Sequence, residues 1–130
     1  MSSREEQADE LREMLMRRAM AGRPWVRARF IDDGDGTDPP ESFLQRFADL
    51  PGRVRKVSEA RIGEHNSVWD PDTGEEGYTL EATVVRWIDD RTAEAWYSAW
   101  HMSESAGGGQ GTARLSGGGW SFDEYETWAS

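Results

Sequence analysis

The sequence predicts an α+β fold in which N-terminal helices pack on a curved antiparallel β-sheet of four to five strands. Two patterns lead to this expectation: helical spacing of apolar residues is found before residue 50, and strand-like alternation dominates after it. The chain has 130 residues with seven Trp, four Phe and three Tyr, which supply enough apolar surface for one buried core. We therefore expect a single domain over residues 1–130.

The clearest helix is predicted over residues 4–20. Gly22 and Pro24 end it, and Arg17 and Arg18 lie near its carboxyl end, as the helix dipole favours. Its apolar residues recur three or four positions apart, at Ala8, Leu11, Leu15 and Ala19. One face of this helix should therefore pack on the rest of the protein.

After this helix the sequence predicts a short strand, a turn and a second short helix. Apolar and Arg residues alternate over 25–31, which is typical of a strand with one exposed face. The segment DDGDGTDPP that follows is rich in turn-forming residues. Aligning Gly36 with the glycine of an EF-hand loop puts Ile31 and Ser42 at the first and last ligand positions, so no metal site is predicted. The short helix is expected over 40–49.

The remainder of the chain predicts four antiparallel strands. Their expected ranges are 53–63, 77–89, 92–103 and 112–128, the last with an interruption at 117–119. The glycine-rich segment SAGGGQG, residues 105–111, is expected to form a flexible hairpin loop. Consecutive strands joined by short loops imply a meander, in which each strand pairs with the next.

The loop between the second and third of these strands decides which side chains share a face, because a change of one residue in its length reverses the pairing. An even loop would place Tyr97 and His101 on the apolar face beneath small alanines, and would leave a pocket near Arg86. A three-residue loop over 89–91 would bring the two apolar faces together, and we favour it. It predicts three cross-strand pairs: Leu80 with Trp100, Val84 with Trp96, and Arg86 with Glu94.

The charge of the chain is strongly asymmetric. Residues 1–65 carry 12 basic and 13 acidic residues, a net charge of −1, whereas residues 66–130 carry 3 and 12, a net charge of −9. The total of −10 makes nucleic acid an unlikely partner for the surface as a whole. The arginines between Arg17 and Arg29 either bind an anion or pair with the acidic half of the chain, and we favour pairing.

Composition excludes several kinds of site. Without Cys the chain has no disulfide, no thiolate nucleophile and no iron–sulfur or zinc–thiolate centre, and no cofactor is predicted. No apolar stretch approaches the roughly 18 residues of a membrane span. The first ten residues are acidic, where a secretory signal is basic and then apolar, so the expected location is cytoplasmic.

The order of elements resembles a known superfamily. A long helix, a short strand, the segment PESFLQRFADLPG and four strands that end in GGGWSFDEYETW resemble the cystatin-like cone of the nuclear transport factor two-like superfamily. That superfamily includes ketosteroid isomerases and SnoaL-like cyclases, and AEAWYSAWHM and GGGWSFDEYE resemble its last two strands. The resemblance implies a cone lined with aromatic residues, in which one or two Asp, His or Tyr side chains move a proton.

The candidate site residues follow from this reading and from the polar residues of the strands. The candidate catalytic residues are His101, Tyr97, Glu81 and Asp123. The candidate ligand-binding residues are Tyr78, Trp96, Trp100 and Trp120. A competing interpretation places His101 and Tyr97 on the outer face of the sheet, where members of the superfamily dimerise, and we favour it over catalysis.

Three functions remain open at this point. The leading expectation is a domain that binds a small hydrophobic ligand or serves as a dimeric scaffold, with a homodimer formed through the sheet. The first alternative is an isomerase, dehydratase or cyclase that uses one of the acid–base candidates. The second alternative is an acidic module whose second half engages a basic protein.

Overall fold

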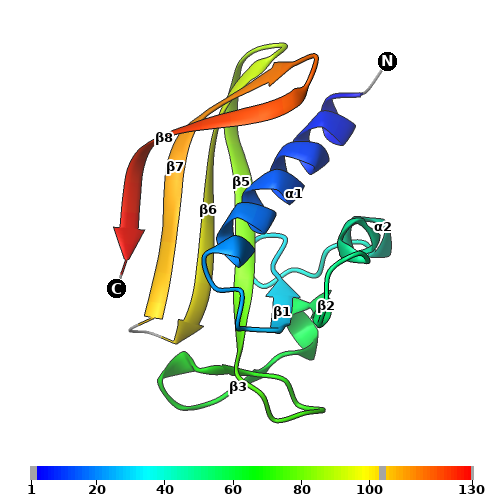
Figure 1. Ribbon diagram of the computed structural model, residues 1–130, viewed down its shortest axis with the longest axis vertical. Helices are drawn as coiled ribbons and strands as arrows, with labels where there is room; N and C mark the ends of the chain where they lie inside the picture. Colours follow the sequence, from blue (N-terminus) through cyan, green and yellow to red (C-terminus); the bar gives the residue numbers. More distant parts are fainter. Residues whose placement is uncertain (1–2, 103–104, 130) are drawn as a thin grey trace.

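Helix α1 (Arg4–Ala21) crosses one face of a six-stranded sheet (Figure 1). The computed structural model describes residues 3–102 and 105–129. The remaining helices are short: α2 (Glu41–Leu44), η1 (Gln45–Phe47), η2 (Val57–Glu59) and η3 (Glu64–Asn66). The strands are β1 (Ala28–Ile31), β2 (Arg53–Lys56), β3 (Arg61–Ile62), β4 (Val68–Trp69), β5 (Gly77–Asp89), β6 (Thr92–Met102), β7 (Ser105–Ser116) and β8 (Gly119–Ala129).

The topology corrects the predicted fold class. The described residues contain eight strands, of which six form one mixed sheet in the order β2-β1-β5-β6-β7-β8, while β3 and β4 form a small second sheet. β1 runs parallel to both β2 and β5, and the strands from β5 to β8 are antiparallel. The expectation of N-terminal helices on an antiparallel sheet of four to five strands is therefore wrong. The protein is mostly sheet, and α1 is the one helix longer than four residues in the part described.

The first helix agrees with its predicted bounds, and of its predicted apolar face Leu11 and Leu15 are buried. Its N-cap is Ser3, whose side-chain oxygen accepts a hydrogen bond of 3.1 Å from the backbone N–H of Glu6, and Gly22 forms its C-cap. The buried face of α1 contacts β5, β6 and β8. That face consists of Leu11, Leu15, Met16 and Met20.

The predicted strand over 53–63 is interrupted in the structure. η2 separates β2, at the edge of the large sheet, from β3 in the small sheet. The carboxylate of Asp38 accepts hydrogen bonds from the backbone N–H of Ser58, at 2.9 Å, and from its hydroxyl, at 2.6 Å. This contact holds η2 against the acidic turn, so the chain leaves the sheet edge after four paired residues. The predicted helix over 40–49 is confirmed in part, as α2 and η1.

The pairing of β5 with β6 differs from the favoured prediction. Leu80 lies opposite Ala99 and Val84 opposite Ala95, so the predicted Trp partners are wrong. The turn between Asp89 and Thr92 has two residues, and the register shifts once between Val84 and Arg86 and again between Trp87 and Asp89. The first shift restores the predicted pair of Arg86 and Glu94, which is bidentate with N–O distances of 3.0 and 3.1 Å.

This register places small residues under the helix. One core cluster contains the buried side chains of α1, two phenylalanines of the α2–η1 segment and five alanines of the sheet. Those alanines are Ala82, Ala93, Ala95, Ala99 and Ala113. Because an alanine face stands only a methyl group above the sheet, helix α1 can approach closely and bury its larger Leu and Met side chains there. The indoles of Trp96 and Trp100 consequently lie on the opposite face.

The glycine-rich segment over 105–111 is a strand, so the expected hairpin loop is wrong. It forms the first part of β7 and pairs with β6 and β8 along its length. Side chains of β8 lie directly over the glycines: a Cβ on Gly108 would lie 2.6 Å from the Trp128 ring, and one on Gly109 would lie 2.7 Å from the Glu124 carboxylate. Glycine is therefore needed for close approach. The actual connection between β6 and β7, residues 103–104, lies outside the described residues.

The close packing at Gly108 predicts a loss of stability on substitution. In Gly108→Ala the new methyl group meets both the Tyr97 carbonyl oxygen and the Trp128 ring, and we expect the free energy of unfolding to fall by about 1–3 kcal/mol. Urea denaturation measures this difference. Gly117→Ala is the matched control, because a Cβ there has nothing within 4 Å and should change stability little. Equal effects of the two substitutions would contradict the packing described for β7.

Candidate functional site

A groove of about 480 Å³ lies on the face of the sheet opposite α1. Its floor comes from three neighbouring strands, and its rim comes from the loop after β1, from η2 and from β3. The floor residues are Thr79, Glu81, Ser98, Trp100 and Ala106. The rim residues are Asp32, Gly36, Val57 and Ile62. The groove therefore combines an apolar wall with a few polar groups, as ligand sites commonly do.

The strand register assembles the floor of the groove. Thr79 lies directly opposite Trp100, and Glu81 lies directly opposite Ser98, so these four side chains point to one face of the β5–β6 pair. Trp100 also packs against a second core cluster formed by Ala28, Phe30 and Val68. The indole is thus held between the small sheet and the groove, and it forms a fixed apolar wall.

Glu81 is the most unusual side chain of the groove. Its carboxylate is half-buried and makes no hydrogen bond or ion pair with any other described residue. Burial raises the pKa of Glu81 above its ordinary value, the nearby charges of Asp32 and Asp35 raise it further, and Arg12 lowers it in part. An unpaired, partly desolvated carboxyl group is available to bind a ligand or to exchange a proton.

The acidic loop on the rim is held by its own hydrogen bonds. Oδ1 of Asp32 accepts the backbone N–H groups of Gly34 and Gly36 at 2.8 and 3.0 Å. Asp33 accepts a hydrogen bond from the Arg12 guanidinium. This agrees with the prediction of a turn. Within residues 3–102 and 105–129, no group of three or more His, Asp or Glu side chains is placed to hold a metal ion.

The four predicted catalytic residues do not converge. Glu81 lies in the groove, whereas Asp123 is exposed on β8. His101 is mostly buried, with Nδ1 2.7 Å from the carbonyl oxygen of Gly77 and its ring 6.0 Å from the ring of Trp69. A protonated Nδ1 donates to that carbonyl. His101 thus ties β6 to the start of β5, and it does not line the groove.

Tyr97 belongs to a separate polar cluster on the α1 face. Its hydroxyl donates to the Glu124 carboxylate, which also accepts Nε of Arg18 at 3.1 Å. Burial raises the pKa of Tyr97, and the hydrogen bond with Glu124 raises it further. The ring packs against the core beneath the helix. The interpretation that placed Tyr97 on an outer face is therefore wrong.

The predicted ligand-binding aromatics also separate. Trp100 lines the groove, and Trp96 lies on the same sheet face without lining it. Tyr78 is fully buried in the core. Trp120 packs on Trp87 at a ring distance of 5.8 Å, and its Nε1 donates to the Gln7 carbonyl at 3.2 Å. Of this set, only Trp100 keeps the predicted role as a candidate.

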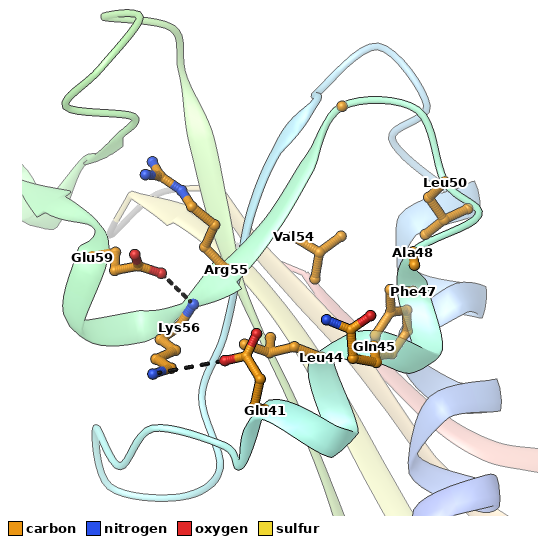
Figure 2. Close-up of a pocket in the computed structure, with 11 residues that line it drawn as sticks. Glu41, Leu44, Gln45, Phe47, Ala48, Leu50, Val54, Arg55, Lys56 and Glu59 are labelled. Atoms are coloured by element: carbon orange, nitrogen blue, oxygen red, sulfur yellow. Dashed lines mark hydrogen bonds and ion pairs between the residues drawn. The ribbon is translucent and has the colours of Figure 1, made fainter.

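A second groove, of about 350 Å³, lies between the α2–η1 segment and strand β2 (Figure 2). Its charged side chains already have partners. Nζ of Lys56 lies 3.9 Å from the Glu41 carboxylate, and Glu59 accepts the backbone N–H of Lys56 at 3.0 Å. Arg55 binds Asp70 at 2.7 Å. The first groove differs because its carboxyl group, Glu81, has no such partner in the part of the chain described.

Two arginines of the run, Arg17 and Arg18, form ion pairs within the protein. Arg17 binds Glu13 at 2.9 Å and Asp49 at 2.7 Å, and both acids belong to the first half of the chain. Arg18 binds Glu124 in the acidic half. Pairing therefore accounts for these two arginines, although only Arg18 reaches the half that the charge asymmetry indicated.

Comparison with known proteins adds no relative: no family model, curated protein or solved structure matches the chain. The resemblance to the nuclear transport factor two-like superfamily therefore stays a prediction. No helix in the described residues is long and apolar enough to cross a membrane.

Sequence reasoning missed the partners of Glu81 and Trp100. By alternation, Thr79 lies on the same face of β5 as Glu81, and Ser98 lies on the same face of β6 as Trp100. The favoured register placed these two faces on opposite sides of the sheet. The even register, the alternative to the favoured one, would have brought all four together. The rim residues Val57 and Ile62 carry no signal of this kind, because they come from short irregular segments.

The raised pKa of Glu81 predicts a stability change with a definite sign. The folded chain holds the Glu81 proton more tightly than the unfolded chain, so the ionised carboxylate opposes folding at neutral pH. We expect Glu81→Gln to raise the free energy of unfolding at pH 7. The gain should shrink as the pH falls and disappear below the unfolded-state pKa of about 4.3. Denaturation at a series of pH values measures it.

Glu94→Gln is the matched control with the opposite sign. The hydrogen bond with Arg86 lowers the pKa of Glu94, so its charge stabilises the fold above the unfolded-state pKa, and this stabilisation is lost as the pH falls through the lowered value. Glu94→Gln should therefore lower stability at pH 7. If Glu81→Gln did the same, the Glu81 carboxylate would have a stabilising partner and the site description would be wrong.

Proposed function

We propose that the protein binds a small, mostly apolar ligand in the groove between Trp100 and Glu81. One observation carries this proposal: an unpaired, half-buried carboxyl group faces the same groove as a fixed indole. Retaining such a carboxyl costs stability, as the raised pKa of Glu81 indicates. Costs of this kind are common at functional sites.

The dimensions and lining of the groove support the same proposal. Its volume of about 480 Å³ lies within the range of roughly 300–1,000 Å³ that small-molecule sites occupy. Trp100, Val57 and Ile62 offer apolar contacts, and Ile62 is 49% exposed although it is a large aliphatic residue. A ligand that covers Ile62 and Trp100 would remove this apolar surface from water.

Proton transfer by Glu81 is the second candidate function, and the raised pKa of its carboxyl group favours it. A carboxyl group that titrates closer to neutral pH is a better general acid or base. This candidate corresponds to the isomerase, dehydratase or cyclase alternative. The variant Glu81→Gln distinguishes catalysis from binding. It would abolish turnover, because the proton-transferring group is lost, but it would still bind an apolar ligand.

The homodimer through the sheet also stays a proposal. The edge strand β8 supports it, because Tyr125 and Trp128 are 57% and 41% exposed there. Sedimentation velocity over a range of concentrations checks whether the chain self-associates.

The proposed binding predicts a specific effect of Trp100. In a fragment screen followed by ligand-observed NMR, we expect apolar fragments to bind the protein, and Trp100→Ala to weaken them about tenfold because the wall of the groove is lost. Trp25→Ala is the control, since Trp25 is 74% exposed and does not line the groove. Absence of any fragment that discriminates Trp100→Ala from Trp25→Ala would refute the proposed function.

A further inference from the structure

We propose that the ligand of the groove is an organic monocation, in which a primary ammonium group is attached to an aromatic or aliphatic body. This inference rests on the proposed function and names the chemical class of its ligand. Three observations carry it: the charge of the lining, the free hydrogen-bonding groups on the floor, and the apolar walls around them.

The lining of the groove carries negative charge only. Asp32 and Glu81 contribute carboxyl groups, and no Lys, Arg or His is among the lining residues. Asp35, in the same loop as Asp32, adds to the negative potential at Glu81. An electrically complementary ligand is therefore positive.

Arg12, the base among the described residues that lowers the pKa of Glu81, already has other partners. Arg12, on α1, donates to the carbonyl oxygen of Ala82 at 2.9 Å and also binds Asp33. It does not line the groove. The negative potential of the groove is consequently not cancelled by an internal ion pair, and a bound cation would supply the missing positive charge.

The floor offers the hydrogen bonds that an ammonium group requires. Oδ1 of Asp32 already accepts the N–H groups of Gly34 and Gly36 at 2.8 and 3.0 Å, and its Oδ2 accepts only a longer contact of 3.3 Å from Gly36, so Asp32 contributes charge and one partly free oxygen. Glu81 and Ser98 lie directly opposite each other, and neither side chain has a hydrogen bond to another described residue. A primary ammonium has three donors, so it can bind the carboxylate and the hydroxyl together.

The walls distinguish an organic cation from a metal ion. Trp100, Val57 and Ala106 provide no side-chain oxygen or nitrogen ligand to a metal, and within the described residues no group of three or more Asp, Glu or His side chains is placed to hold a metal ion. The indole of Trp100 instead suits an organic cation, because its π face attracts positive charge and its body packs against an apolar group.

The experiment compares three ligands of similar shape but different charge: 2-phenylethylamine, 2-phenylethanol and 3-phenylpropanoate. Affinities at pH 7 are measured by ¹H–¹⁵N NMR titration of the full chain, in which shifts of the Trp100 indole and the Glu81 amide report the site. We expect the amine to bind at least about tenfold more tightly than the alcohol, and the carboxylate to bind most weakly. Glu81→Gln should remove the preference for the amine, whereas the matched control Glu126→Gln, an exposed residue of β8 outside the groove, should retain it.

A pH series provides a second readout that needs no variant. The groups that act on Glu81 are Asp32, Asp35 and Arg12, and burial has the largest effect on its pKa. Because Glu81 takes up a proton as the pH falls through its raised pKa, amine binding should weaken there while alcohol binding stays constant.

The outcomes separate the two proposals. Equal affinity for amine and alcohol, with shifts at Trp100, would overturn the organic-cation inference and leave the proposed binding function standing. Amine binding that persists unchanged in Glu81→Gln would also overturn the inference. If none of the three ligands, nor any fragment of the screen, shifts the Trp100 indole, both proposals fail.

Discussion

The register between β5 and β6 is the constraint on which the rest of the structure depends. With Leu80 opposite Ala99 and Val84 opposite Ala95, alanines face α1, and Trp96 and Trp100 face away from it. A shift of the pairing by one residue would turn the side chains of β6 to the opposite face relative to those of β5. The helix would then meet two indoles instead of methyl groups, and the groove would lose its aromatic wall. The core and the candidate site thus follow from one pairing.

The two faces of the sheet are covered to different extents. α1, which crosses one face of the sheet in Figure 1, completes a large core there together with the α2–η1 segment. The small β3–β4 sheet covers only part of the other face. Near the small sheet the second face is buried, as Phe30 and Val68 show with no exposed surface. Where that cover ends, Ile62 remains exposed and Glu81 remains unpaired. The groove therefore lies at the edge of the β3–β4 sheet, where the second face of the large sheet is no longer covered.

Local patterns in the sequence predict much of this structure. The wrong predictions concern segments that pair with residues far away in the sequence. Caps and spacing are sufficient for the first helix. The predicted pair of Arg86 and Glu94 also forms, but only because the register shifts between Val84 and Arg86. β1 shows the limit: the alternation of apolar and Arg residues predicts one exposed face, but all four residues of the strand, Arg29 included, are buried, so that expectation is wrong. Ala28 pairs with Gly77, 49 positions later. No local sequence pattern predicts a parallel partner strand that far away in the sequence.

The candidate site, too, could be predicted from the sequence only in part. Glu81 and Trp100 are recognisable as individual residues, but their place on one face of the sheet depends on the two-residue turn between Asp89 and Thr92, whereas the favoured three-residue loop puts them on opposite faces. Likewise, glycines usually weaken a strand, so residues 105–111 resemble a loop. The reason that they form a strand lies in β8, where Trp128 and Glu124 occupy the space above them.

The position of α1 in the chain has a consequence for synthesis. α1 is made before strands β5, β6 and β8, yet its buried face, which includes Leu11 and Leu15, packs on those strands. A ribosome therefore releases an amphipathic helix whose apolar face has no native cover until most of the chain has emerged. During that interval the helix is exposed to chaperones and to other nascent chains. Folding of this protein is thus coupled to the completion of its C-terminal half.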